Sequence, residues 1–418
     1  MKHLSSKSDD PEGLRTVLHH EWLRTGYAVL AFFLLLCSYT MLRPVRDDMA
    51  VRFGADRLHW LFTGTFLCTL AVIPLFGAVV HHARRNAILP VCYGFLVLNL
   101  LGFCAAFRAE GNAWTAAAFF IWLSVFNLFV VSLFWSNVSD AFNAQEAQRR
   151  YGMIAAGGTV GAMAGPAITA LVARYVSTST LLATSAGLIF LATICMMALR
   201  NASPGDNGTS LRPVGGSIVA GVPLTLKLPE LRGIALLVIC LTTVSTVLYV
   251  EIISLAGQHY ASSGERKTFF ASVDLAVNLL AFGLQLAGTR FVVRHAGLAL
   301  ALSIAPVLML AGLVVLGIRP TLIGFAAIQI LHRASEYAFG KPGREMIYTT
   351  IGPEGRFKAK NFIDTTVYRA NDAASAWLIN LVRGAGWSAV LLVGLPAVLV
   401  WLVAAFRTGI RFDRRTDK

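Results

Sequence analysis

The sequence predicts an all-α membrane protein with twelve transmembrane helices. Of its 418 residues, 56% are hydrophobic and only 14% are charged. A soluble chain averages roughly 45–50% apolar and about 25% charged residues, because polar side chains must cover its surface. The apolar residues also form long runs of roughly 20 residues, the length that a helix needs to cross a bilayer. Composition and run length together indicate a chain that is solvated by lipid.

The apolar runs fall into two sets of six. The first predicted spans cover residues 26–46, 59–80, 87–107, 113–136, 151–173 and 178–199, and the second set covers 231–256, 268–293, 296–318, 320–340, 361–382 and 385–407. The stretch 200–230 between the sets is rich in Gly, Pro, Ser and Asn and reads as a linker. Six helices on either side of a central linker are typical of the major facilitator fold.

Loop charges set the predicted orientation. The chain carries a formal net charge of +14, and its Lys and Arg residues gather in alternate loops, as the positive-inside rule expects. We therefore predict a cytoplasmic N-terminal segment 1–25, a six-helix half 26–199, a cytoplasmic linker 200–230, a second half 231–407 and a basic cytoplasmic tail 408–418. The same distribution explains the basic balance without nucleic acid, which we do not expect as a partner.

The first polar cluster stands at the end of the first predicted span. Arg43, Arg46 and Asp47 surround Pro44, which can kink a helix. If the helix continues through this point, these charges face a cavity, whereas a helix that ends near Leu42 leaves them at the membrane interface. We expect the cavity.

Three further spans carry charges that are costly inside a membrane. Glu251 lies in the seventh span and Asp274 in the eighth, where an isolated carboxylate is a candidate for charge balance or proton coupling. Arg333 and Glu336 in the tenth span are three residues apart, and this spacing predicts a direct ion pair.

The eleventh span holds the fourth cluster. Asp364, Tyr368 and Asp372 are spaced by four, so they share one helical face, and Arg369 lies three residues before Asp372. An arginine presents a planar fork of donors that suits a carboxylate or phosphate group.

Enzyme chemistry is not indicated. The sequence has no Ser/His/Asp set, no paired catalytic carboxylates and no HExxH motif in a suitable context, so we predict no catalytic residue, no metal site and no cofactor.

Four motifs resemble bacterial members of the ATP/ADP translocase family, the nucleotide antiporters of the major facilitator type. They are LRPVRD at 42–47, SLFWSNVSDAF at 132–142, RRYGMIAAGGTVGAMAGP at 149–166 and KAKNFIDTTVYRANDA at 358–373. The resemblance implies an integral protein of the bacterial inner membrane. It matches Arg46, Asp47 and Glu251 to charged positions of the exchangers. Asn127 is the nearest polar residue to a fourth-span Glu of that family, and Asp372 falls where the family has an eleventh-span Lys.

These observations together predict a secondary active transporter that moves a polar, anionic small solute by alternating access. Substrate binding is assigned to Arg43, Arg46, Asn127, Arg333, Tyr368 and Arg369. Coupling or charge balance is assigned to Asp47, Glu251, Asp274, Glu336, Asp364 and Asp372. Nucleotide exchange and proton-coupled transport of a non-nucleotide solute both stay open, and a non-transporting membrane scaffold or sensor is the alternative of another class. We expect a monomer whose partners are its solute and the lipid bilayer.

Overall fold

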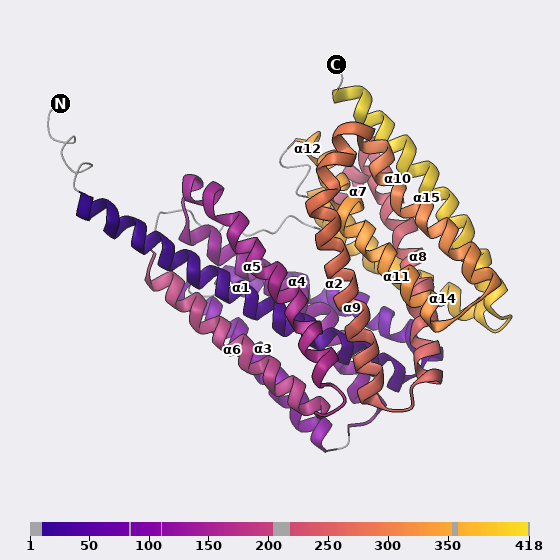
Figure 1. Cartoon of the computed structure of the whole chain (residues 1–418), viewed down its shortest axis with the longest axis horizontal. Coiled ribbons are helices and arrows are strands. Elements are labelled where there is room, and N and C mark those ends of the chain that lie inside the picture. The colour runs from indigo at the N-terminus through magenta and orange to yellow at the C-terminus, as the bar shows by residue number, and fades with distance from the viewer. Residues whose placement is uncertain (1–10, 83–84, 110, 204–217, 353–357, 417–418) are drawn as a thin grey trace.

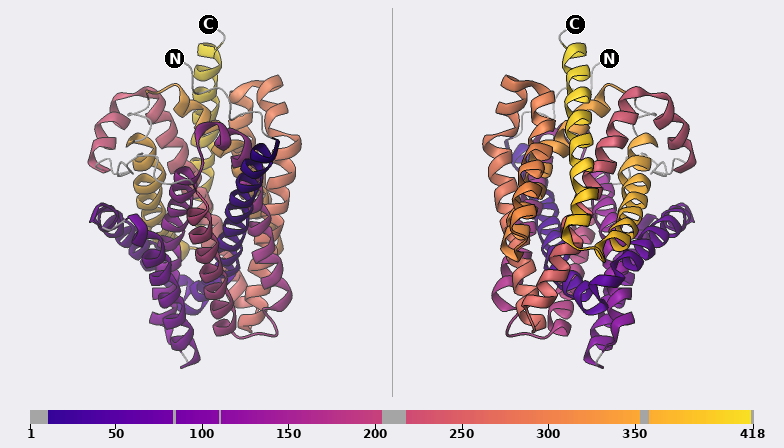
Figure 2. Two further views of the ribbon diagram at one scale, coloured as in Figure 1. Left: turned by 90° about the vertical axis from the view of Figure 1, so that its left-hand side faces the viewer. Right: turned by 90° about the vertical axis from the view of Figure 1, so that its right-hand side faces the viewer.

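The computed structural model describes residues 11–82, 85–109, 111–203, 218–352 and 358–416, and within these ranges every regular element is helical. Parts of the predicted N-terminal segment (1–10), linker (204–217) and tail (417–418) lie outside the described residues. Figure 1 shows two groups of helices, and the perpendicular views of Figure 2 show both described chain ends at the same end of the molecule.

The N-terminal group consists of long helices. They are α1 (Pro11–Phe53), α2 (Leu58–His82), α3 (Arg85–Arg108), α4 (Ala113–Ala141), α5 (Ala144–Val172) and α6 (Thr178–Asn201), with the short 3₁₀ turn η1 (Ala55–Arg57) before α2. Capping fixes several starts: the Asn143 side chain accepts from the backbone N–H groups of Gln145 and Glu146 at the start of α5, and Ser177 caps α6.

The C-terminal group contains two interruptions of α-helical geometry. Its elements are α7 (Ile218–Lys227), α8 (Pro229–His259), α9 (Ser263–Ala287), α10 (Thr289–Ile318), α11 (Leu322–Ser335), η2 (Glu336–Gly340), α12 (Lys341–Thr349), η3 (Phe362–Val367), α14 (Tyr368–Arg383) and α15 (Trp387–Thr416). The segments η2 and η3 are π-helical. Such segments are rare and occur frequently at functional sites.

Nine of the described helices are long and apolar enough to cross a membrane: α1, α3, α4, α5, α6, α8, α9, α10 and α15. A helix also occupies each of the other three predicted spans, namely α2, α11 with η2, and η3 with α14. The regular stretches α11 and α14 have only 14 and 16 residues, because π-helical geometry interrupts them. The all-helical membrane fold is confirmed, and the number twelve stays a prediction.

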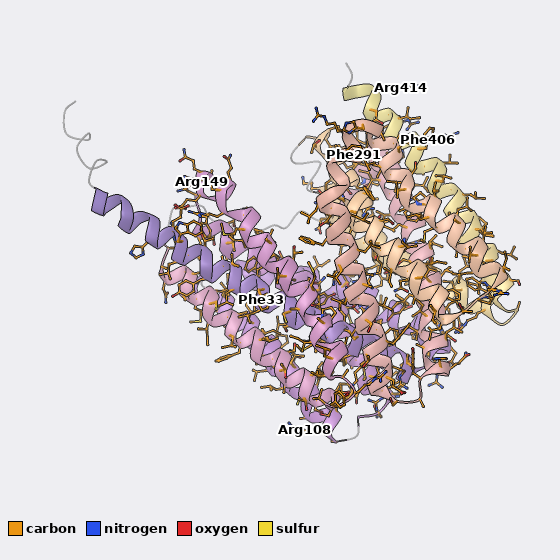
Figure 3. All side chains as sticks on the ribbon, in the orientation of Figure 1. Phe33, Arg108, Arg149, Phe291, Phe406 and Arg414 are labelled. Atoms are coloured by element: carbon orange, nitrogen blue, oxygen red, sulfur yellow. The ribbon has the colours of Figure 1, made fainter. Side chains whose placement is uncertain are left out.

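The outer surface of the molecule suits lipid. The side chains of Phe291 and Phe406 are 63% and 47% exposed on the flanks of their helices. Figure 3 shows both phenylalanines in the C-terminal group, with Arg108 at one end of the molecule and Arg149 and Arg414 toward the other. Apolar flanks between charged ends are expected when a bilayer surrounds the protein.

Two buried hydrophobic cores correspond to the two groups of helices. One is formed by residues of α1, α3, α4, α5 and α6. The other is formed mainly by α8 to α15, and it also takes in Ala50 and Phe53 at the end of α1, Leu58 and Leu61 at the start of α2, and Phe120 in α4. The two groups therefore share buried contacts at the end of the molecule where α1 stops.

Within the N-terminal group, glycines let α5 approach α1 closely. A Cβ atom at Gly157 would lie 2.9 Å from the carbonyl oxygen of Val29, and one at Gly161 would collide with the backbone of Phe33. A Cβ at Gly152 would have nothing within 4 Å. Gly157 and Gly161 thus serve the packing of α5 against α1, whereas Gly152 does not.

Candidate functional site

A cavity of about 450 Å³ lies between the two groups of helices. Its wall is formed by α1, α2 and α4 on one side and by α8, α11, η2, α12, η3 and α14 on the other. Cavities of roughly 300–1,000 Å³ are the size that holds a small organic molecule.

Ten of the twelve predicted site residues line this cavity. They are Arg43, Arg46, Asp47, Asn127, Arg333, Glu336, Asp364, Tyr368, Arg369 and Asp372. They come from α1, α4, α11, η2, η3 and α14, so residues more than 300 positions apart in the sequence meet at one place.

Helix α1 continues through Pro44 to Phe53, which resolves the choice between cavity and interface for the first cluster. Arg46 Nη2 lies 2.7 Å from Asp47 Oδ1, and the Tyr249 hydroxyl donates to the same oxygen at 2.8 Å. The Arg46 guanidinium also lies over the rings of Phe120 and Tyr249, at 5.3 and 5.9 Å from their centroids. Arg46 is thus held by an ion pair and by two aromatic faces.

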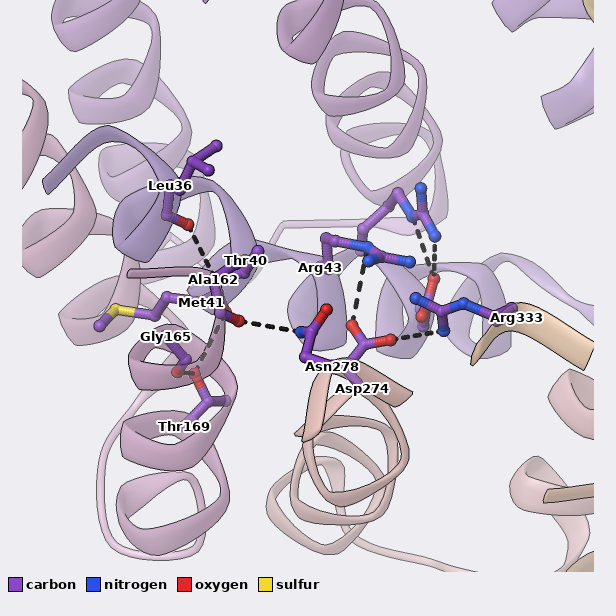
Figure 4. A network of polar contacts seen from close by, with 12 residues as sticks. Leu36, Thr40, Met41, Arg43, Ala162, Gly165, Thr169, Asp274, Asn278 and Arg333 are labelled. Carbon is purple, nitrogen blue, oxygen red and sulfur yellow. Dashed lines mark hydrogen bonds and ion pairs between the residues drawn. The ribbon is translucent and has the colours of Figure 1, made fainter. Parts of the chain in front are cut away.

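Asp274 does not line the cavity, but it binds two arginines that do. Its Oδ1 accepts from Arg333 Nη1 at 2.6 Å, and its Oδ2 lies 3.6 Å from Arg43 Nε (Figure 4). The Asp274 side chain is only 2% exposed. One buried carboxylate on α9 therefore joins α1 of the N-terminal group to α11 of the C-terminal group.

The predicted ion pair between Arg333 and Glu336 is wrong. Arg333 binds Asp274, and Glu336 Oε1 lies 2.6 Å from Arg344 Nη1 on α12. The reason is local geometry: the π-helical segment begins at Glu336, so the residues after Arg333 no longer follow the spacing of an α-helix.

Glu251 lies outside the cavity wall. Its Oε1 is 3.4 Å from Arg383 Nε at the end of α14, and both side chains are largely buried. The prediction of Glu251 as a charge-balancing residue of the site therefore finds no support in its position, which is that of an ion pair between α8 and α14.

The cluster on η3 and α14 faces the cavity as its spacing predicted. Arg369 Nη1 lies 3.6 Å from Asp372 Oδ2, and Arg369 Nη2 donates to the Ser124 carbonyl oxygen of α4 at 3.2 Å. The Thr246 hydroxyl of α8 donates to Asp372 Oδ1 at 3.2 Å. Arg369 thus bridges the two groups of helices, whereas Asp372 is held within the C-terminal group.

Sequence reasoning missed several cavity residues. The missed residues include Gln329 and His332 on α11, Tyr337 on η2, and Lys341, Arg344, Glu345 and Tyr348 on α12. The predicted tenth span ends at 340 with the apolar run, so residues 341–348 lie between two predicted spans. The spacing of Lys341, Arg344, Glu345 and Tyr348 by three and four is the pattern of one helical face, and it could have revealed α12.

A second set of contacts joins the groups where α1 ends. Asp48 is fully buried, and its Oδ1 and Oδ2 accept from Arg266 Nε and the Ser263 hydroxyl, each at 2.5 Å. Lys267 donates to the Thr178 hydroxyl at 3.1 Å, and Trp377 Nε1 of α14 donates to the Thr63 hydroxyl of α2 at 3.0 Å. These contacts close the space between the groups on that side of the cavity.

Comparison with known proteins gives the family and the fold. The profile of the Major Facilitator Superfamily matches residues 28–348. No protein of curated function matches the sequence.

Three solved structures are similar over nearly the whole chain. A bacterial homologue of the human lysosomal transporter Spinster, inward-facing and unoccupied, has a TM-score of 0.61 at 12% identity and covers 94% of this chain and 98% of its own. The nucleoside transporter NupG has a TM-score of 0.62 at 12% identity, with 95% and 99% covered. A bacterial homologue of the iron transporter ferroportin, inward-facing, has a TM-score of 0.64 at 14% identity, with 94% and 99% covered.

Proposed function

Because the chain belongs to the Major Facilitator Superfamily, we propose that it is a secondary active transporter that binds a polar, anionic solute in the cavity between its two halves. The family and its transporter fold indicate a transporter and not an enzyme. The observation that carries the substrate proposal is the arginine lining, because Arg43, Arg46, Arg333, Arg344 and Arg369 reach one cavity from both halves. Guanidinium groups in such a site recognise carboxylate or phosphate.

Alternating access is supported by the asymmetry of the contacts between halves. Asp48 with Arg266, and Trp377 with Thr63, join the halves on the side where α1 ends. In the predicted orientation that side is external, and we therefore propose a state closed to the outside. A scaffold has no need of a polar cavity at the junction of two halves, and we therefore favour transport.

Reconstituted protein tests the proposal. We expect liposomes that contain the wild-type chain to accumulate a labelled organic anion, and the Arg369→Ala variant to lose at least tenfold in uptake at equal protein content. Arg369 is chosen because it contacts both Asp372 and the α4 backbone beside the cavity. Unchanged uptake by this variant would remove Arg369 from the site.

Two modes of transport stay open for this cavity. Nucleotide exchange is supported by the resemblance of LRPVRD at 42–47, whose Arg46 and Asp47 line the cavity. Proton-coupled transport is supported by the carboxylates Glu336, Asp364 and Asp372 in the wall. Uptake that requires internal counter-substrate indicates exchange, whereas uptake that collapses with an uncoupler indicates proton coupling.

A further inference from the structure

The buried cluster of Arg43, Asp274 and Arg333 contains two positive charges and one negative charge. Arg43 and Arg333 share this one carboxylate, and among the described residues no other carboxylate lies within 4.0 Å of either guanidinium. Arg43 Nε and Arg333 Nη2 are buried without a hydrogen-bond partner in the described part of the chain. This trio therefore has a net charge of +1, and it lies where α1 and α11 face the cavity.

The other arginines of the cavity are paired one to one. Arg46 binds Asp47, Arg344 binds Glu336, and Arg369 binds Asp372. Each of these pairs is neutral as a unit. Their remaining N–H groups can donate to a polar ligand, but they add no net charge that could balance a second anionic group.

The remaining charged residues of the wall also balance. Glu345 lies 2.6 Å from Lys360. Lys341 and Asp364 line the cavity with no ion pair to a described residue, and their charges are opposite. The described cavity with its immediate ion-pair partners thus has one surplus positive charge, and that charge belongs to the Arg43–Asp274–Arg333 trio.

From this balance we propose that the cavity binds an organic solute with a single net negative charge, and that its anionic group docks between Arg43 and Arg333. The inference rests on the proposed transport function and narrows its substrate. An uncompensated charge in a site of low dielectric is strongly unfavourable, so the surplus guanidinium selects one anionic group. A nucleoside polyphosphate would leave several charges unbalanced, so the structure disfavours ATP/ADP exchange.

A charge-graded screen tests the proposal on the full-length protein in detergent. The probes are the monoanions lactate and gluconate, the dianion malate, the trianion citrate, and ADP and ATP, within a wider set of metabolite anions at matched ionic strength. A ligand of the folded state raises its melting temperature, and the rise increases with the logarithm of the ratio of ligand concentration to Kd. We expect the strongest saturable stabiliser to be a monoanion, with a Kd that rises at least tenfold in both Arg333→Gln and Arg43→Gln.

A matched control removes a guanidinium elsewhere. Arg383→Gln takes the same group from an ion pair outside the cavity, with Glu251, and we expect its Kd to stay within twofold of the wild-type value. Asp274→Asn adds one net positive charge to the trio, and we expect it to raise the affinity for dianions relative to monoanions at least tenfold.

The outcomes separate the two proposals. Strongest saturable binding of ATP, ADP or citrate to the wild-type protein overturns the single-charge assignment and leaves anion transport standing. Arg333→Gln and Arg43→Gln variants that fold and bind the monoanion as tightly as wild type also overturn it. If no anion of any charge stabilises the protein, the proposed function itself is wrong.

Discussion

Asp48 holds the two halves of the protein together where α1 ends. Its carboxylate is fully buried and accepts from Arg266 Nε and the Ser263 hydroxyl of the opposite half. The perturbation that we consider is Asp48→Asn, which keeps the size of the side chain and removes its charge. Arg266, with a side chain only 11% exposed, would then lose its ion-pair partner.

The expected free-energy cost of Asp48→Asn follows from the burial of Arg266. Removal of one partner of a buried ion pair costs roughly 3–5 kcal/mol, because the other charge remains buried and unpaired. Arg266 also donates to the carbonyl oxygens of Tyr260 and Ala261, which retain part of its solvation, so we take the lower value of about 3 kcal/mol. Each 1.4 kcal/mol is a factor of ten, so the ratio of closed to open molecules should fall about 100-fold.

Distance measurements between the halves provide the assay. The six native cysteines are first replaced, and new cysteines are introduced at Ala109 and His259, which are both exposed at this end of the molecule. Spin labels on these two cysteines report the separation of the halves. We expect a longer distance to become populated in Asp48→Asn. The control is Asp56→Asn, because Asp56 and Arg57 form an exposed pair at 3.9 Å, of a kind worth only about 0–1 kcal/mol.

Identical distance distributions for Asp48→Asn and the wild-type protein would refute this reasoning. The contact between Asp48 and Arg266 would then not determine whether the two halves separate at this end of the molecule. A distribution that changes equally in Asp56→Asn would refute it as well, since burial would then have no bearing on the result.

Two further predictions concern packing and the ion pair outside the cavity. Gly161→Ala should destabilise the protein by about 1–3 kcal/mol, because its Cβ would collide with the backbone of Phe33. The control is Gly152→Ala, and a melting temperature of Gly161→Ala no lower than that of the control would contradict the close approach of α5 to α1. Glu251→Gln should lower the stability of the protein by about 1–2 kcal/mol, since its ion pair with Arg383 is largely but not fully buried. The Kd of the solute should stay within twofold of the wild-type value. A tenfold weaker affinity would place Glu251 in the binding site after all.

The fold was predictable because lipid imposes a simple rule on sequence. Helices that face a bilayer need long apolar runs, and the runs near 87–107 and 178–199 correspond closely to α3 and α6. The same rule made Arg43, Arg46 and Arg369 visible, since a charge inside an apolar run is rare and marks a polar path.

The pairing of those charges could not be read from the sequence. Arg333 and Glu336 have a spacing that suits a helical ion pair. In the structure Arg333 at the end of α11 binds Asp274 of α9, and Glu336 at the start of the π-helical segment binds Arg344 of α12. Spacing along one helix carries no information about a partner on another helix.

The position of Glu251 was hidden for a different reason. A single carboxylate in an apolar run has no periodicity, so nothing in the sequence tells which face of α8 it occupies. Tyr249, two residues earlier on the same helix, points into the cavity and contacts Asp47, whereas Glu251 meets Arg383 at the end of α14. On a helix, residues two positions apart lie on different faces.

We propose that the solute binds in the cavity between the halves during transport, and site-directed thiol labelling of the cavity wall can test this. Ser245 lines the cavity, so a Ser245→Cys variant without native cysteines places one reactive thiol in its wall. We expect a maleimide reagent to abolish uptake by this variant and the stabilising monoanion to slow the labelling in proportion to its occupancy. Labelling at the same rate with and without that anion, and uptake that survives complete modification, would contradict the claim.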